Sequence, residues 1–74
     1  MMKLIDGRCG ELYTVKGMEL EHGIKRRLEI LGLTHNSEVL ILNTKRNGSM
    51  IIRVRGTRFA LGEKIAKGIT VDEC

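Results

Sequence analysis

The chain has 74 residues, the size of one small domain, and a formal net charge of +4. No apolar stretch approaches the roughly 20 residues that a membrane-spanning helix requires, and no basic segment followed by an apolar run opens the chain as in a secretory signal. We therefore expect one soluble, cytoplasmic domain over residues 1–74.

The first predicted strand runs from Cys9 to Val15 and is entered through the turn-forming pair Asp6-Gly7. Its apolar residues alternate loosely, and tyrosine, threonine and valine favour a half-buried pleated surface. Either Leu12 or Tyr13 is expected to face inward. Glycine occurs nine times and proline not at all, so we expect glycines to punctuate short elements within the domain.

The spacing of apolar residues changes to that of an amphipathic helix from about Glu21 to Leu31. The apolar stripe consists of Leu20, Ile24, Leu28 and Leu31. Lys25 and Arg26 fall on the opposite side. Gly32 suits the left-handed position that follows a helix, and Leu33 is then expected to fold back on the last turn, as in a Schellman motif.

A β-hairpin is predicted next, with arms Glu38–Thr44 and Met50–Arg55. Asn47-Gly48 lies between these apolar runs, and Asn-Gly is the strongest short-range hairpin signal because both turn residues favour positive φ. The residue pattern after the hairpin predicts a helical turn around residues 61–66, a break at Gly68 and a closing strand over residues 69–71. Short twisted strands with one amphipathic helix and a helical turn indicate a mainly β fold, a small and partly open barrel.

Nothing in the sequence matches a catalytic, nucleotide-hydrolysing or metal-binding pattern. Cys9, His22, His35 and Cys74 stand alone, without the paired spacing of zinc ligands. There is no phosphate-binding loop and no nucleophile with a recognisable base. We therefore expect no enzyme activity, no cofactor, no dedicated metal site and two free thiols. These absences favour a binding module.

Basic residues provide one set of candidate contacts. On the second arm of the hairpin, alternation sends Arg53 and Arg55 outward, and Lys25 and Arg26 lie on the polar side of the helix. These side chains either dock on phosphate or an acidic protein, or cover apolar surface with their stems while the charges stay in water. Because the chain has only one tyrosine and one phenylalanine to stack on bases, a nucleic-acid partner is not expected.

Leu40 and Leu42 provide an apolar candidate. Burial of Val39 and Ile41 would leave both leucines pointing away from the same core. They either form an exposed contact patch or pack beneath the helix or the closing strand. The sequence leaves the two arrangements open.

From about Gly17 to Val71 the chain resembles the FeoA family, the small ferrous iron transport protein A of bacteria and archaea. The resemblance is carried by Arg27, Leu28, Leu31, Gly32, Leu33, Val39, Val54, Gly56, Ala60, Leu61, Ala66, Ile69 and Val71. It implies an SH3-like barrel without catalysis that assists the membrane ferrous iron transporter FeoB, whose cytoplasmic part carries a GTPase domain. His35-Asn36 stands where the family usually has Pro-Gly, and asparagine tolerates the left-handed conformation that glycine would adopt there.

Three hypotheses follow. The first is an adaptor that binds FeoB or its GTPase domain through Lys25, Arg26, Leu40, Leu42, Arg53 and Arg55. The second is a basic barrel that binds nucleic-acid phosphates. The third is an iron-responsive regulatory module, because a similar fold ends the iron-dependent repressors. Unpaired strand edges would also permit weak self-association.

Overall fold

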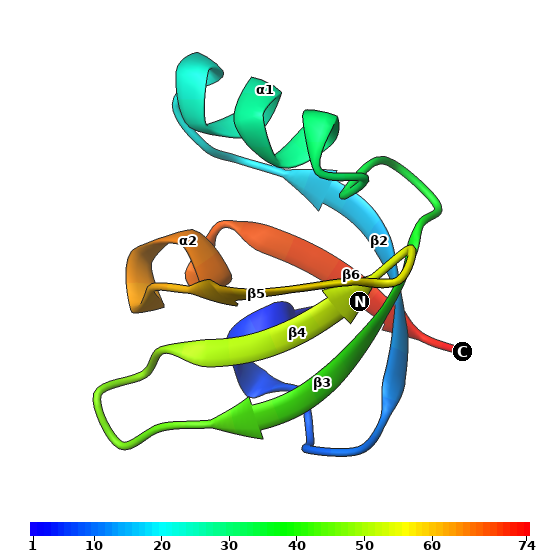
Figure 1. Cartoon of the computed structure of the whole chain (residues 1–74), viewed down its shortest axis with the longest axis vertical. Helices are drawn as coiled ribbons and strands as arrows, with labels where there is room; N and C mark the ends of the chain where they lie inside the picture. Colours follow the sequence, from blue (N-terminus) through cyan, green and yellow to red (C-terminus); the bar gives the residue numbers. More distant parts are fainter.

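The computed structural model describes all residues, 1–74. Its strands form one six-stranded antiparallel sheet in the order β1-β6-β2-β3-β4-β5 (Figure 1). The elements are β1 (Met2–Lys3), a 3-10 turn η1 (Leu4–Asp6), β2 (Leu12–Met18), α1 (His22–Ile30), β3 (Glu38–Thr44), β4 (Met50–Val54), β5 (Thr57–Leu61), α2 (Glu63–Lys67) and β6 (Ile69–Glu73). The molecule measures 26 × 25 × 24 Å, so the sheet curls around its core. The predicted mainly β fold is confirmed.

One cluster of fourteen buried apolar residues forms the core. It contains Leu4, Tyr13, Val15, Leu28, Leu33, Val39, Ile41, Met50, Ile52, Val54, Leu61, Ala66, Ile69 and Val71. The strands alternate between this core and the outer surface, as a two-residue period requires. In β3, Val39 and Ile41 are fully buried, and in β4 the same holds for Ile52. The predicted inward positions of Ile52 and Val54 and the outward position of Arg53 are confirmed.

Helix α1 lies at one end of the barrel (Figure 1) and ends in the predicted Schellman motif. Gly32 has a φ of 103° and donates its N–H to the Glu29 carbonyl at 3.0 Å, and the Leu33 N–H reaches the Leu28 carbonyl at 2.9 Å. Leu28 and Leu33 are both buried, which joins the helix end to the core. Leu31, expected in the buried stripe, remains 38% exposed.

The loop between β3 and β4 differs from the predicted two-residue turn. Lys45 donates its N–H to the Ser49 carbonyl at 2.8 Å, and Gly48 donates to the Lys45 carbonyl at 3.0 Å. Gly48 has a φ of 89°, but Asn47 does not have a positive φ, so that part of the prediction is wrong. The Asn47 side chain instead accepts hydrogen bonds from the Ser49 N–H and hydroxyl, which holds a longer loop together.

The tight two-residue turn lies between β4 and β5, at Arg55-Gly56. Val54 pairs directly with Thr57, and the two residues between them have φ values of 49° and 80°. Positive φ at both central residues is the signature of a type I′ hairpin turn. Arginine is not a typical residue at such a position, which explains why no turn was predicted there.

Several strand boundaries also differ from expectation. Strands β1 and β5 have no predicted counterpart, because β1 has two residues and β5 lacks a run of β-branched residues. Leu61 ends β5, so the helical turn expected from Leu61 begins at Glu63 instead. The closing strand is confirmed and extends to Glu73.

Strand β2 begins at Leu12 and continues to Met18, whereas Cys9–Val15 was expected. Gly10 has a φ of 84° and donates its N–H to the Ile41 carbonyl at 2.7 Å, so the chain is still turning there. Tyr13 is 3% exposed and points inward, which leaves Leu12 on the outer surface. The choice between Leu12 and Tyr13 is thereby resolved.

The expected left-handed turn at Asn36 is confirmed by its φ of 70°. Its backbone N–H reaches the Val15 carbonyl at 2.7 Å, and its side-chain oxygen accepts a hydrogen bond from Lys16 at 3.1 Å. The loop before β3 is therefore fixed to β2.

Replacing Gly32 by alanine is expected to lower the free energy of unfolding by about 1–2 kcal/mol, because a non-glycine residue is strained at positive φ. The added Cβ would also lie 2.8 Å from Arg55 Cδ. Urea denaturation measures the change. Gly17→Ala is the control, since Gly17 has no positive φ and a Cβ there meets nothing within 4 Å. Equal losses in the two variants would contradict the importance of the helix end.

Candidate docking surface

The outer surface of the sheet carries a row of four side chains, one from each of four adjacent strands. Leu12 pairs with Leu40, Leu40 pairs with Arg53, and Arg53 pairs with Arg58. Directly opposite residues share a face of a sheet. Because Val39, Ile41, Ile52 and Val54 occupy the core face, this outer row of two leucines and two arginines faces solvent.

A groove of about 380 Å³ lies over part of the outer row. Its lining comprises Leu12, Asn36, Ser37, Glu38, Leu40, Arg53, Arg55 and Gly56. Leu12 is 45% exposed and Leu40 is half-buried, so apolar surface remains open to a partner here. Arg53 projects from β4, and Arg55 projects from the turn that follows β4. We refer to the groove with all of these lining residues as the docking groove.

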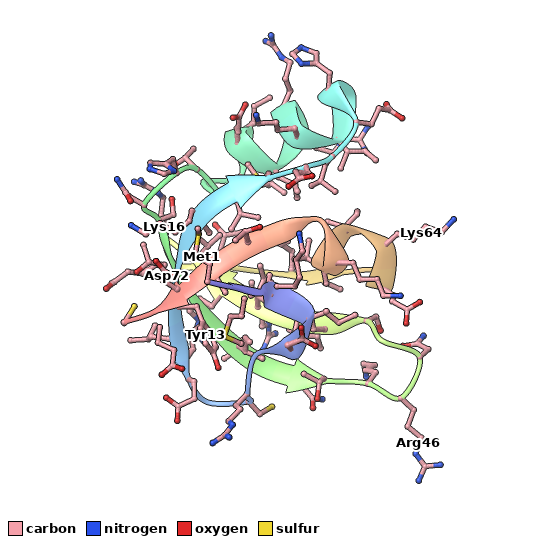
Figure 2. The ribbon with its side chains drawn as sticks, turned by 180° about the vertical axis from the view of Figure 1, so that it is seen from behind. Met1, Tyr13, Lys16, Arg46, Lys64 and Asp72 are labelled. Atoms are coloured by element: carbon pink, nitrogen blue, oxygen red, sulfur yellow. The ribbon has the colours of Figure 1, made fainter.

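The arginines of this surface have no carboxylate partner within the molecule. The chain contains two ion pairs, one between the Met1 amino group and Asp72 at 3.4 Å and one between Lys67 and Glu63 at 4.0 Å. Figure 2 shows Met1 and Asp72 together, Met1 directly before β1 and Asp72 on β6. The side chains of Arg53 and Arg58 make neither an ion pair nor a hydrogen bond, so the fold does not use their charges.

Arg55 differs from the other two arginines because the protein holds it in place. Its Nε donates a hydrogen bond to the Gly32 carbonyl at 3.2 Å. The stem of Arg55 lies over Gly32, where a Cβ would find Arg55 Cδ at 2.8 Å and Cγ at 3.4 Å. A carbonyl at a helix C-terminus carries partial negative charge, which favours a cation there. The end of α1 therefore orients the guanidinium beside the docking groove.

The structure separates the six candidate contact residues. Leu40, Arg53 and Arg55 share the docking groove. Lys25 lies elsewhere, in a cavity of about 230 Å³ with Lys16, Glu29 and His35 among its lining residues. Arg26 is exposed on α1.

Leu42 occupies a β-bulge. The pairing of β3 with β4 shifts register between Ile41 and Asn43, so Leu42 is the extra residue. It is half-buried, and its carbonyl accepts a hydrogen bond from the Cys9 thiol at 3.3 Å. Leu42 does not line the docking groove that contains Leu40.

Leu12 and Arg58 belong to the outer row but are absent from the sequence-based set. Their place depends on strand register and on the existence of β5, neither of which the sequence pattern revealed. An alternation that began at Tyr13 would have indicated Leu12. No sequence signal identifies Arg58.

Cys9 and Cys74 are free and exposed. The Cys74 sulfur lies 3.2 Å from the Thr14 hydroxyl.

No three histidine, cysteine or acidic side chains gather where they could hold a metal ion. Neither helix has the length and apolarity required to cross a membrane.

Replacing Arg53 and Arg58 together by serine is expected to change the free energy of unfolding by less than about 0.5 kcal/mol, because neither charge has a partner in the fold. Arg55→Ser is expected to cost about 1 kcal/mol, because it removes a hydrogen bond and a packed stem. Urea denaturation compares the variants. A loss above about 1 kcal/mol in the double variant would show that these arginines support the fold.

The family model of the FeoA domain matches residues 2–73. A solution structure of the FeoA protein from Chlorobium tepidum has a TM-score of 0.91 and 27% sequence identity, covering 97% of this chain and 70% of that one. A crystal structure of Stenotrophomonas maltophilia FeoA complexed with zinc has a TM-score of 0.83 and 30% identity, covering 97% of this chain and 91% of that one. That protein is described as a prokaryotic SH3-domain protein and suggested to be a ferrous iron transport activating factor.

A manganese-dependent transcriptional repressor has a TM-score of 0.87 at 20% identity, covering 97% of this chain and 41% of that one. At this identity the likeness concerns the fold alone. No curated protein sequence matches the chain. The predicted SH3-like barrel is confirmed by the solved relatives. The chain belongs to the FeoA family, a family of small accessory domains associated with ferrous iron transport.

Proposed function

We propose that this protein is a non-enzymatic adaptor that binds the cytoplasmic part of the membrane ferrous iron transporter FeoB, including its GTPase domain, and modulates transport or nucleotide turnover. The observation that supports this role is the outer row, where exposed Leu12 and half-buried Leu40 adjoin arginines without partners in the fold. Such a surface suits a protein partner with an apolar centre and acidic neighbours.

The size of this surface favours a reversible contact. Stable interfaces bury on the order of 800 Å² on each partner, and the two leucines form only a small apolar centre. Arginine recognises carboxylates through a planar fork and loses less water than lysine on binding. Affinity would then depend on a few central side chains, and charge would chiefly control the rate of association.

A nucleic-acid-binding role is the second candidate, because Arg53 and Arg58 could contact phosphates instead of carboxylates. Against it, Tyr13 is buried and Phe59 is half-buried against the core, so neither lies on the outer row. Labelled oligonucleotide titrated at two salt concentrations separates the candidates. Binding that weakens steeply with salt and competes with FeoB would favour the nucleic-acid role.

We expect calorimetric titration of this protein into the FeoB cytoplasmic domain of the same organism to show saturable binding, with an affinity that changes with guanine nucleotide. Leu40→Asp and Arg53→Glu should each weaken binding about tenfold, as truncation of a central contact commonly does. Arg46→Glu is the matched charge control, since Figure 2 shows Arg46 pointing away from the barrel at the tip of the β3–β4 loop.

Equal affinity in Leu40→Asp, Arg53→Glu and Arg46→Glu would exclude the docking groove. The pair Lys25→Glu and Arg26→Glu then tests the other candidate residues on α1. No binding to the domain or to the full transporter, in any nucleotide state, would contradict the adaptor role.

A further inference from the structure

We propose that the docking groove recognises a short protein segment in which acidic residues lie directly beside large apolar residues. A carboxylate would bind the Arg55 guanidinium and an apolar side chain would cover Leu12 and Leu40. This inference rests on the proposed docking role and adds the chemistry of the segment that binds.

The arrangement of Arg55 favours a carboxylate. Its Nε is already bonded to the Gly32 carbonyl at 3.2 Å, which leaves the terminal Nη groups available. No acidic side chain of the molecule pairs with them, and Glu38, which lines the same groove, forms no ion pair. An arginine fixed in this way loses little conformational freedom when it binds. Arg53, on the same groove, supplies a second cation for a neighbouring carboxylate.

The apolar side of the groove favours a large aliphatic or aromatic residue beside that carboxylate. Leu12 and Leu40 are directly paired across β2 and β3, so their side chains form one continuous patch. The groove, of about 380 Å³, is the size of a small-ligand site, so it accommodates only a short length of chain. The segment is therefore short, and the carboxylate and the apolar residue must lie close together in its sequence.

Charge argues against a second copy of this chain as the occupant through the same face. Two copies that met through this face would bring Arg53, Arg55 and Arg58 of both into one interface, and like charges repel. An acidic segment from another protein meets the same surface with complementary charge.

The probes are three capped hexapeptides that differ only at defined positions. The first, Ser-Glu-Glu-Leu-Leu-Ser, carries both features. In the second, glutamine replaces each glutamate, which removes the charge and keeps the shape. In the third, serine replaces each leucine, which removes the apolar pair. Titration into the full chain labelled with nitrogen-15 monitors the arginine Nε–H signals and the backbone amides.

We expect the first peptide to shift the Arg55 Nε–H signal and the amides of Leu12, Leu40 and Gly56. Each of the other peptides should bind about tenfold more weakly, because each lacks one of the two contacts. No shift at these positions up to millimolar peptide would overturn the proposal. Equal affinity for the glutamine peptide would do the same, and so would displacement by an oligonucleotide with higher affinity at moderate salt.

Arg55→Lys and Arg58→Lys form the matched pair of variants, because both keep the net charge. Arg58 belongs to the outer row but not to the docking groove. We expect Arg55→Lys to weaken the first peptide about tenfold and Arg58→Lys to leave it unchanged, since lysine lacks the planar fork. Thermal unfolding of both variants verifies the fold. Unchanged affinity in both variants would indicate general attraction to charge, and equal loss in both would remove the special role of Arg55; either result would contradict the proposal.

The same variants separate this inference from the adaptor role. If the FeoB cytoplasmic domain binds Arg55→Lys as tightly as the unmodified protein, the recognition chemistry is wrong and the adaptor role stands. If the peptide binds as expected but FeoB does not bind, the groove chemistry stands and the adaptor role fails.

Discussion

Burial of alternate residues in the central strands is the constraint on which the rest of the molecule depends. Val39, Ile41, Ile52 and Val54 must all reach the same core, and they are buried almost completely. Since successive side chains on a strand point to opposite faces, their burial determines that Leu40 and Arg53 face outward. The docking groove is thus a geometric consequence of how β3 and β4 fill the barrel.

The second important contact joins the end of α1 to the turn between β4 and β5. Gly32 completes the Schellman motif, and its carbonyl also accepts a hydrogen bond from the Arg55 side chain. One glycine therefore both ends the helix and orients an arginine of the docking groove. Helix α1 is therefore connected to the proposed binding surface, although the candidate residues Lys25 and Arg26 do not line the docking groove.

Much of the fold could be predicted because local signals were strong. The helix, its glycine end and the two arms of the hairpin all follow from apolar spacing and from Gly32. The strands β1 and β5 could not, since β1 is very short and Arg58 and Ala60 give β5 little strand character. For the candidate site, alternation alone places Leu40 and Arg53 on the outer surface. The positions of Leu12 and Arg58 can be predicted only when the register between strands is known, and the position of Leu42 only when the bulge is known. Tertiary packing determines both features.

The left-handed backbone at Arg55 bears on how this sequence can vary. An arginine with a φ of 49° gives up about 1 kcal/mol that glycine would not, and asparagine would give up less. That strain is about as large as the roughly 1 kcal/mol that the hydrogen bond to Gly32 and the packed stem contribute, so the two effects nearly cancel. Keeping an arginine there is a trade-off of the kind found at functional positions, where a protein retains a strained residue for what it binds. In variants of this barrel selected for stability without binding, arginine and glycine should therefore be exchanged freely at this position.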